Sequence, residues 1–377
     1  MNNGNSTNQV DYNLHGAVGI RLCNASPGDV AAVTRQLGPI QAPLTREPDI
    51  VIEFVDQVKL SSPLRYLGVN DTAFTDDAFF VLRSKNKARS MVQIPFAEIG
   101  QQCRIVCATG LPAVPLLIPI LNLTALNRGI LPLHASAFRY QDVGVLTTGW
   151  SKGGKTETLL AFMDRGANYI GDEWVYISDD GRHMTGIPEP IRVWEWHLDS
   201  MPQYWSTLGQ GDRFRLRSLK ALASSIDRTT ETGLVKGTSV GRQMKRVATL
   251  SKMQMHVDLE PQELFGAGVA APQAAVDKVI FVGSHASPEI TVQPMDPVEI
   301  AERMVFSLQE ERQNFMSHYY RFRFAFPHAR NPLVEEAEEL QRTLLTRMLA
   351  GKDAYAVYHP YPVAIPALYD AIAPLLR

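Results

Sequence analysis

The chain has 377 residues, of which 45% are hydrophobic and 20% are charged, and its formal net charge is −2. This length supports one large core or two to three domains, and the near-neutral charge excludes a global attraction to nucleic acid or to anionic membranes. The three cysteines, Cys23, Cys103 and Cys107, make no disulfide framework and suit the reducing cytoplasm, where we expect the protein to reside.

The first fourteen residues are polar and lack both the basic start and the apolar stretch of a signal peptide. We expect residues 1–14 to be disordered. The most apolar segment, 111–133, is interrupted by four prolines and by Asn122, Asn127 and Arg128. A membrane-spanning helix needs about twenty uninterrupted apolar residues. The segment is therefore predicted to be a buried helix from Pro115 to Gly129, and no membrane partner is expected.

Residues 15–128 are predicted to form a small α+β domain. A helix is expected after Ser26, which can cap it, with Pro27 in its first turn and Gly38 at its end. Short runs rich in β-branched and aromatic residues predict strands around it. These runs are 16–22, 49–55, 78–83, 90–96 and 103–109.

Residues 129–296 are predicted to be a second α/β domain, which carries a glycine-rich loop and ends in a strand at 276–283. From 297 onward, apolar residues recur at helical spacing over 297–315, 331–351 and 365–377. We therefore predict a helical C-terminal region over 297–377.

The glycine-rich loop is the most specific motif. Residues 149–156, GWSKGGKT, fit the pattern G-x-x-x-x-G-K-[ST] between an apolar strand and a helix. In such a loop, backbone N–H groups converge on phosphate oxygens, the lysine reaches the terminal phosphates and the hydroxyl ligates Mg²⁺. The motif predicts ATP and Mg²⁺ as ligands. The predicted nucleotide-binding residues are Gly149, Ser151, Lys152, Gly153, Gly154, Lys155, Thr156 and Glu157.

Two adjacent carboxylates, Asp172 and Glu173, lie in the strand predicted directly after the helix of the loop. A magnesium ion bound by one hydroxyl needs carboxylate ligands as well. Thr156, Asp172 and Glu173 are therefore the predicted metal ligands. Neighbouring side chains in a strand point to opposite faces, so we expect one carboxylate to hold the metal while the other orients it or serves elsewhere.

The region from about 130 to 285 resembles the catalytic domain of HPr kinase/phosphorylase, whose phosphate-binding fold is shared with phosphoenolpyruvate carboxykinases. Three positions depart from the family pattern, since Lys152 replaces a glycine, Thr156 a serine and Glu173 an aspartate. The residues that match the family pattern are His134, Ser136, Gly149, Ser151, Gly154, Lys155, Glu157, Thr158, Arg165, Gly166 and Asp172.

The resemblance implies an α/β fold, namely a P-loop kinase core of the HPr kinase and phosphoenolpyruvate carboxykinase type with a mixed β-sheet. This core would follow the small α+β domain and precede the C-terminal helices. The implied activity is transfer of the γ-phosphoryl group of ATP to a hydroxyl. Asp172 would be the base or a metal ligand, and His134 would orient the acidic pair.

A kinase must also neutralise charge on the moving phosphoryl group. Lys155 is the predicted cation, and Arg192, which follows the acidic strand closely, is a candidate second cation. The acceptor stays open between a serine of a protein or peptide and a small hydroxylated metabolite. The alternative function is an ATP-binding regulatory or assembly module with little or no kinase activity, which the altered loop and the large flanking regions favour.

The stretch 213–252 is rich in lysine and arginine. It is interpreted as a solvated excursion, as a mobile loop that closes over ATP or an acidic substrate, or as a contact for nucleic acid. The scarcity of aromatic residues there argues against single-strand binding, so nucleic acid is not an expected partner. The resemblance also allows a homo-oligomer.

Overall fold

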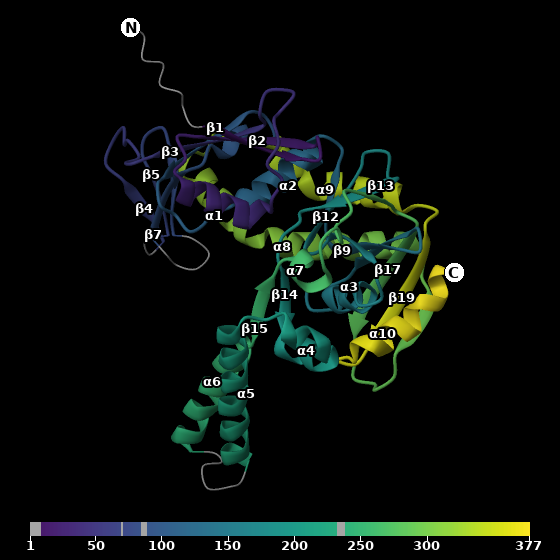
Figure 1. The fold of residues 1–377 in the computed structure, drawn as a ribbon. Coiled ribbons are helices and arrows are strands. Elements are labelled where there is room, and N and C mark those ends of the chain that lie inside the picture. The colour runs from purple at the N-terminus through teal and green to yellow at the C-terminus, as the bar shows by residue number, and fades with distance from the viewer. Residues whose placement is uncertain (1–8, 69–70, 84–88, 232–237) are drawn as a thin grey trace.

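The computed structural model describes residues 9–68, 71–83, 89–231 and 238–377. Within these ranges the chain is a mixed α/β protein built on two large sheets, each containing parallel and antiparallel strands. Figure 1 shows the N-terminal sheet at one end of the body and the second sheet at its centre, with a two-helix arm that projects away from both.

The first sheet has eight strands and is formed by the N-terminal part of the chain. β2 and β3 pair in parallel, as do β3 and β8, while the other neighbours are antiparallel. Its strands, in spatial order, are β1 (Gln9–Leu14), β2 (Val18–Cys23), β3 (Ile50–Val55), β8 (Cys103–Ala108), β7 (Arg89–Gln93), β6 (Phe79–Arg83), β5 (Thr72–Phe74) and β4 (Arg65–Leu67).

The second sheet has nine strands and carries the glycine-rich loop. β10, β17 and β19 are parallel to one another, and β9 pairs antiparallel with β10. In spatial order the strands are β16 (Ala274–Ala275), β13 (His183–Gly186), β12 (Trp174–Ile177), β9 (Leu131–Tyr140), β10 (Val143–Thr148), β17 (Lys278–Ser284), β19 (Asp353–His359) and β18 (Thr291–Pro294), with β11 (Asn168–Gly171) also paired to β9.

Helices cover the sheets and form the arm. A third, two-stranded sheet of β14 (Ile191–Trp194) and β15 (His256–Leu259) forms the base of the arm. The helices are α1 (Pro27–Leu37), α2 (Leu117–Asn127), α3 (Lys155–Met163), α4 (Glu195–Ser200), α5 (Gln210–Glu231), α6 (Ser239–Met253), α7 (Pro261–Phe265), α8 (Pro297–Ala325), α9 (Pro332–Leu349) and α10 (Ile365–Ile372), with 3₁₀ turns at Phe96–Glu98, Pro202–Ser206 and Ala373–Leu376.

The two faces of the second sheet pack against different helices. On one face, Ile280 and Val282 of β17 belong to a core shared with α3 and α10. On the other face, Val279 and Phe281 belong to a larger core that also contains residues of α2, α8, α9 and the first sheet. This alternation follows from the period of two in a strand, and it places α3 and α8 on opposite sides of the sheet.

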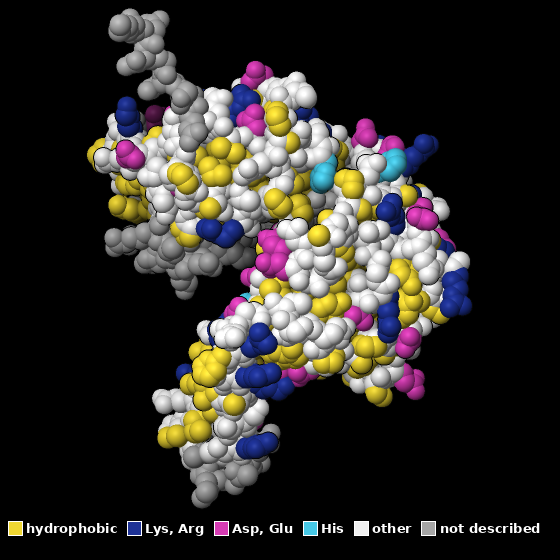
Figure 2. Space-filling view, in the orientation of Figure 1, with side chains coloured by type: hydrophobic (Ala, Val, Ile, Leu, Met, Phe, Trp, Pro, Cys, Tyr) yellow, Lys and Arg dark blue, Asp and Glu magenta, His cyan; other side chains and the backbone are white. Residues whose placement is uncertain are grey.

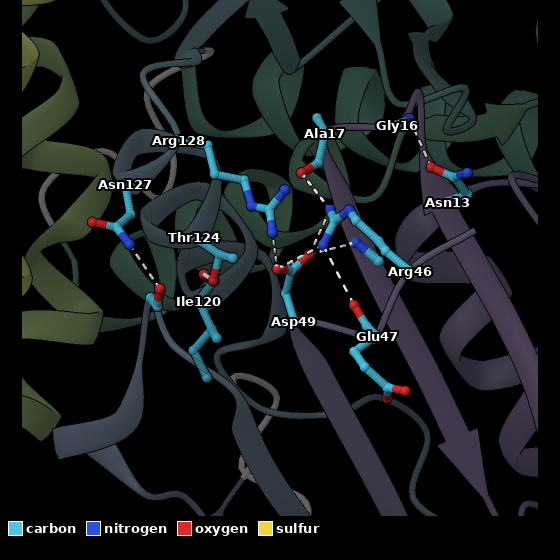
Figure 3. Close-up of polar contacts among 12 residues, drawn as sticks. Asn13, Gly16, Ala17, Arg46, Glu47, Asp49, Ile120, Thr124, Asn127 and Arg128 are labelled. Carbon is cyan, nitrogen blue, oxygen red and sulfur yellow. Dashed lines mark hydrogen bonds and ion pairs between the residues drawn. The ribbon is translucent and has the colours of Figure 1, made fainter. Parts of the chain in front are cut away.

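Polar contacts also tie the first sheet to α2. Asp49, at the start of β3, accepts a hydrogen bond from the Gly19 backbone N–H at 2.8 Å and pairs with Arg46 at 2.8 Å. Arg128, just beyond the C-terminus of α2, forms an ion pair with the same carboxylate (Figure 3). One buried carboxylate therefore satisfies a backbone donor and two guanidinium groups from separate segments.

Several expectations from the sequence are confirmed. Ser26 caps α1 with a capping box, and Gly38 lies at its C-terminus. The buried helix expected from Pro115 to Gly129 is α2. Within the described part of the chain, no helix combines the length and the apolar character needed to cross a bilayer. The predicted domain boundaries stay predictions, and the larger apolar core runs without a break from the first sheet into the second.

Two expectations are wrong. Residues 9–14 are not disordered, because they form β1, whose Tyr12 and Leu14 are fully buried. The remainder of that predicted disordered segment, 1–8, lies outside the described residues. The C-terminal region is not solely helical, because 353–359 forms β19, which lies between β17 and β18. β1 forms a hairpin with the adjacent β2, whereas β19 pairs with β17, which is distant in the chain.

The described parts of the basic stretch 213–252 form a helical arm made of α5 and α6. α5 and α6 pack along each other, and Ala223 and Ala248 are buried. Leu216, near the start of α5, belongs to the apolar core that contains residues of α3 and β17. Phe214, Leu222, Val247, Leu250 and Met253 are exposed on the two helices. Figure 2 shows hydrophobic side chains gathered on one side of the arm and Lys and Arg side chains on the other. The arm projects away from the body (Figure 1), and its interpretation as a lid over ATP or substrate stays a prediction.

Candidate active site

The glycine-rich loop connects the end of β10 to the start of α3. It passes so close to neighbouring chain segments that two of its glycines cannot carry a side chain. A Cβ on Gly149, whose φ is +152°, would lie 2.2 Å from the Val282 carbonyl oxygen. A Cβ on Gly154, whose φ is +110°, would lie 2.0 Å from Nε2 of His359. The glycines of the motif are therefore required by close packing as well as by backbone conformation.

The close approach of Gly154 to His359 predicts the effect of adding a methyl group at position 154. Gly154→Ala is expected to displace the loop from His359 and to weaken binding of Mg²⁺–ATP by about tenfold or more, because misplaced amides no longer converge on one phosphate. Calorimetric titration checks this result. Gly211→Ala is the matched control, since a Cβ there meets nothing within 4 Å. Equal nucleotide affinity in both variants would contradict the prediction.

Lys155, the first residue of α3, is buried beneath the loop and is 6% exposed. Its Nζ donates to the carbonyl oxygens of Trp150 at 3.0 Å and Gly149 at 3.3 Å. Ser136 on β9 donates to the carbonyl oxygen of Lys155 at 2.8 Å and so fixes the start of the helix. Burial lowers the pKa of Lys155, although nearby carboxylates, Glu173 and Asp172 among them, oppose that effect.

Thr156 and Asp172 form the second part of the site. The Thr156 hydroxyl lies 3.0 Å from Oδ2 and 3.3 Å from Oδ1 of Asp172. Asp172 is only 3% exposed, and burial together with the negative charge of Glu173 raises its pKa to about 7. A carboxyl group whose pKa lies near neutrality can exchange a proton at working pH.

The two acidic residues do not lie within a strand, contrary to the sequence prediction. β11 ends at Gly171 and β12 begins at Trp174, so Asp172 and Glu173 form the connection between them. Glu173 has a φ of +64°, in the left-handed region that few side chains adopt. Such a conformation costs about 1–3 kcal/mol and persists where the surrounding structure holds it. The bend, and not strand alternation, separates the directions of the two carboxylates.

His134 on β9 lies between two carboxylates. Its Nε2 is hydrogen-bonded to Oε2 of Glu173 at 3.0 Å. Its Nδ1 lies 2.8 Å from Oε1 of Glu311 on α8, which is an ion-pair distance, but the angles of this contact do not meet those of a hydrogen bond. Burial alone would lower the pKa of His134, but these two carboxylates raise it. Because carboxylates only accept, the imidazolium form fits both contacts. His134 in turn holds the pKa of Glu173 below its usual value.

Some predicted site residues are engaged elsewhere. Glu157 is buried and its carboxylate contacts Nε2 of His197 at 3.1 Å, so its side chain does not face the loop opening. Arg192 on β14 pairs with Asp258 at 3.0 Å, and its charge contributes to lowering the pKa of Glu173. Lys152 is exposed at the tip of the loop, with a φ of +62°. Ser151 is exposed beside it, and Gly153 is buried.

The structure brings two further residues to the site that the sequence analysis missed. Glu311 lies 177 positions beyond His134 in the chain and carries no motif, so only the packing of α8 on β9 reveals it. His359, at the end of β19, is fully buried, and its Nε2 lies 2.9 Å from the Gly153 carbonyl oxygen. A buried histidine beneath the glycine-rich loop leaves no local signal in the sequence.

Oxygen donors suited to magnesium meet at Thr156 and Asp172. Mg²⁺ is bound in proteins by one or two carboxylates together with phosphates and water. Among the described residues, no group of three or more His, Cys, Asp and Glu side chains could hold a metal by itself. The pair therefore fits an ion shared with a bound nucleotide. Glu173, the third predicted ligand, hydrogen-bonds His134 instead.

Comparisons with known proteins give limited information. No family model matches the chain, and no curated protein matches it in sequence. Among solved structures, the HPr(Ser) kinase/phosphatase from Coxiella burnetii is similar over 65% of this chain and 95% of its own, with 12% identity and a TM-score of 0.26. This is a weak structural similarity.

Proposed function

We propose that the protein is an ATP-dependent, Mg²⁺-dependent phosphotransferase of the HPr kinase-like class, which transfers the γ-phosphoryl group to a hydroxyl. The observation that carries this proposal is the placement of Asp172 against Thr156 at the head of α3, directly below a loop with the phosphate-binding pattern. Burying the Asp172 carboxylate lowers the stability of the fold, as its raised pKa indicates. A carboxyl group with a pKa near neutrality is, however, well suited to accept a proton from an alcohol.

The roles follow from position and charge. In the transfer, the bond between the γ-phosphorus and the bridging oxygen of ADP breaks and a bond to the acceptor oxygen forms, while the acceptor proton passes to the Asp172 carboxylate. Lys155 offsets the negative charge of the moving group. His134 is a positioning residue, because it holds the carboxylates of Glu173 and Glu311 in place.

Magnesium would be held by Thr156 and Asp172 and would neutralise charge on the phosphate oxygens when bound. Asp172 therefore has two candidate roles, as metal ligand and as base, and Glu173 becomes available for one of them only if its contact with His134 opens. Arg192 becomes available as a second cation only if its pair with Asp258 opens.

The proposal is tested in two steps. Calorimetry with Mg²⁺ and ATP is expected to show saturable binding. Incubation with γ-labelled ATP and a panel of alcohols, serine peptides and proteins is then expected to place label on an acceptor. Binding without any labelled acceptor across the panel would favour the second candidate function, and no binding would reject both.

The second candidate is an ATP-binding regulatory or assembly module. The projecting arm favours it, because Phe214, Leu250 and Met253 are 75%, 59% and 62% exposed on helices that carry many basic residues. Exposed apolar side chains beside charges are typical of protein interfaces. A partner recovered in an ATP-dependent pull-down, from a protein with no acceptor turnover, would support this function. For the phosphotransferase function, the proposed partners are the nucleotide and the hydroxyl acceptor. We also propose that the protein can form a homo-oligomer.

A further inference from the structure

A cavity of about 290 Å³ lies beside the first residues of the glycine-rich loop, between that loop, β17 and α8. It is separate from the contacts of Asp172 and His134 described above. Its volume is at the lower end of the range for small-molecule sites. The cavity is lined by Trp150, Phe281, Arg303, Met304, Phe306 and Ser307.

Three of the six residues that line this cavity are aromatic. Trp150 is 52% exposed and Phe306 is 57% exposed, which is unusual for such large apolar side chains in a cavity wall. The guanidinium of Arg303 lies 5.4 Å from the ring centroid of Phe281 and also pairs with Glu299. Its charge is therefore already partnered, so the cavity favours a planar apolar group over an isolated anion.

One polar group in the wall has no partner. Ser307 is 2% exposed, and its hydroxyl oxygen makes no hydrogen bond within the described part of the chain. A buried hydroxyl normally finds a partner, and an unmade hydrogen bond costs about 1–3 kcal/mol. A ligand with its own hydroxyl or other polar atom near Ser307 would remove that cost.

The cavity adjoins the end of the loop where the terminal phosphate is expected. In loops of this kind the lysine reaches the β- and γ-phosphates. Here Nζ of Lys155 lies against the carbonyl oxygens of Gly149 and Trp150, and Trp150 is also a wall of the cavity. The nucleoside is at the opposite end of the triphosphate, so the base would leave the loop away from this cavity.

Helix α8 connects the cavity to the acidic residues. Ser307 and Glu311 are four residues apart and lie on the same side of the helix, separated by about 6 Å along its axis. Glu311 contacts His134, which contacts Glu173. A ligand beside Ser307 is thus about one helical turn from Glu311, which is linked through His134 to Glu173, the neighbour of Asp172 in the chain.

We propose that this cavity is the acceptor site, and that the acceptor is a small alcohol carrying a planar aromatic group. The inference rests on the proposed phosphotransferase function. The aromatic group would lie between Trp150 and Phe306, with a polar atom toward Ser307 and the reacting hydroxyl toward Asp172.

The test compares matched alcohols with and without a phenyl group. Binding of 3-phenyllactate and of lactate is measured by calorimetry in the presence of Mg²⁺ and a non-hydrolysable ATP analogue. The native protein is expected to bind 3-phenyllactate about tenfold more tightly than lactate. Phe306→Ala is expected to abolish this preference and to leave the affinity for the ATP analogue within about twofold. Phe324→Ala is the control, because Phe324 lies on the same helix and is 72% exposed outside the cavity.

Other outcomes overturn the inference. Equal binding of the two alcohols by the native protein would show that the cavity does not select an aromatic acceptor. Loss of ATP-analogue affinity in Phe306→Ala, but not in Phe324→Ala, would assign the cavity to the nucleobase instead. If the ATP analogue binds normally and only the phenyl preference is missing, this inference fails while the proposed function stands. If the analogue does not bind at all, the proposed function fails.

Discussion

Replacing Lys155 by methionine is expected to reduce ATP-dependent phosphoryl transfer by about 10²- to 10³-fold. The reason is the position of its ammonium group, which lies against the Gly149 and Trp150 carbonyl oxygens, where the terminal phosphates would be bound. Methionine retains the length of the side chain and removes the charge. A loss of this size corresponds to about 3–4 kcal/mol of transition-state stabilisation. Steady-state rates with labelled ATP measure it.

The same substitution is not expected to unfold the protein. Lys155 is buried, and desolvation of its charge already lowers its pKa, so the neutral replacement removes an electrostatic cost. The free energy of unfolding should stay within about 1 kcal/mol of the native value. Lys59→Met, at an exposed position in the N-terminal part, is the matched control. Full activity in Lys155→Met would remove the nucleotide-binding interpretation of the loop.

Replacing Asp172 by asparagine is expected to lower the transfer rate by about 10²- to 10⁴-fold, because the amide can neither accept the acceptor proton nor serve as an anionic ligand for magnesium. The amide can still contact the Thr156 hydroxyl, so the local geometry is retained. Asp179→Asn is the control, since Asp179 is exposed. A rate close to the native one would show that Asp172 is neither base nor metal ligand.

The Asp172→Asn substitution, which lowers activity, is expected to stabilise the protein, and the gain in stability should grow as pH rises. Burial raises the pKa of Asp172 to about 7 in the folded protein, from the ordinary aspartate value of 3.8 that applies in the unfolded chain. Between these two pH values Asp172 is protonated in the folded protein but ionised in the unfolded chain. The free energy of unfolding of the native protein therefore falls as pH rises from about 4 to about 7. Above that window the full cost applies, at most about 4 kcal/mol.

Denaturant unfolding of metal-free protein at pH 5 and pH 8, with a chelator present, measures this effect. The asparagine variant should be more stable than the native protein at pH 8, and the difference should be smaller at pH 5. A stability difference that is the same at both pH values would mean that Asp172 is ionised throughout, and its assignment as a base near neutrality would be lost.

Local patterns in the sequence predicted those parts of the fold that depend on neighbouring residues. The cap of α1 at Ser26 requires only residues within one turn, and the glycine-rich loop requires only the strand and helix beside it. The strand β1 was missed although its partner β2 is only three residues away, because its residues were grouped with the polar segment that precedes them. The strand β19 was missed because its partner is distant in the chain. β19 is separated by more than sixty residues from β17, the strand with which it pairs.

The acidic pair shows the same limit within the site. Adjacent carboxylates indicated a metal or catalytic role, but the bend at Glu173 and its contact with His134 depend on how β9, β11 and β12 pair. The two side chains do diverge as predicted, Asp172 to Thr156 and Glu173 to His134, but a bend and not strand alternation separates them. Glu311 and His359 could not be found from the sequence, since the contact of each with the site crosses more than 150 positions of the chain.

The sequence by itself determined a glycine-rich loop with the phosphate-binding pattern and the identity of its lysine, hydroxyl and following carboxylates, because these residues lie within about 25 positions of one another. Only the tertiary structure decided that Asp172 is buried against Thr156, that two carboxylates flank His134, and that an aromatic cavity adjoins the loop. Burial, charge proximity and cavity shape arise from side chains that converge from distant strands and helices, and no local pattern encodes that convergence.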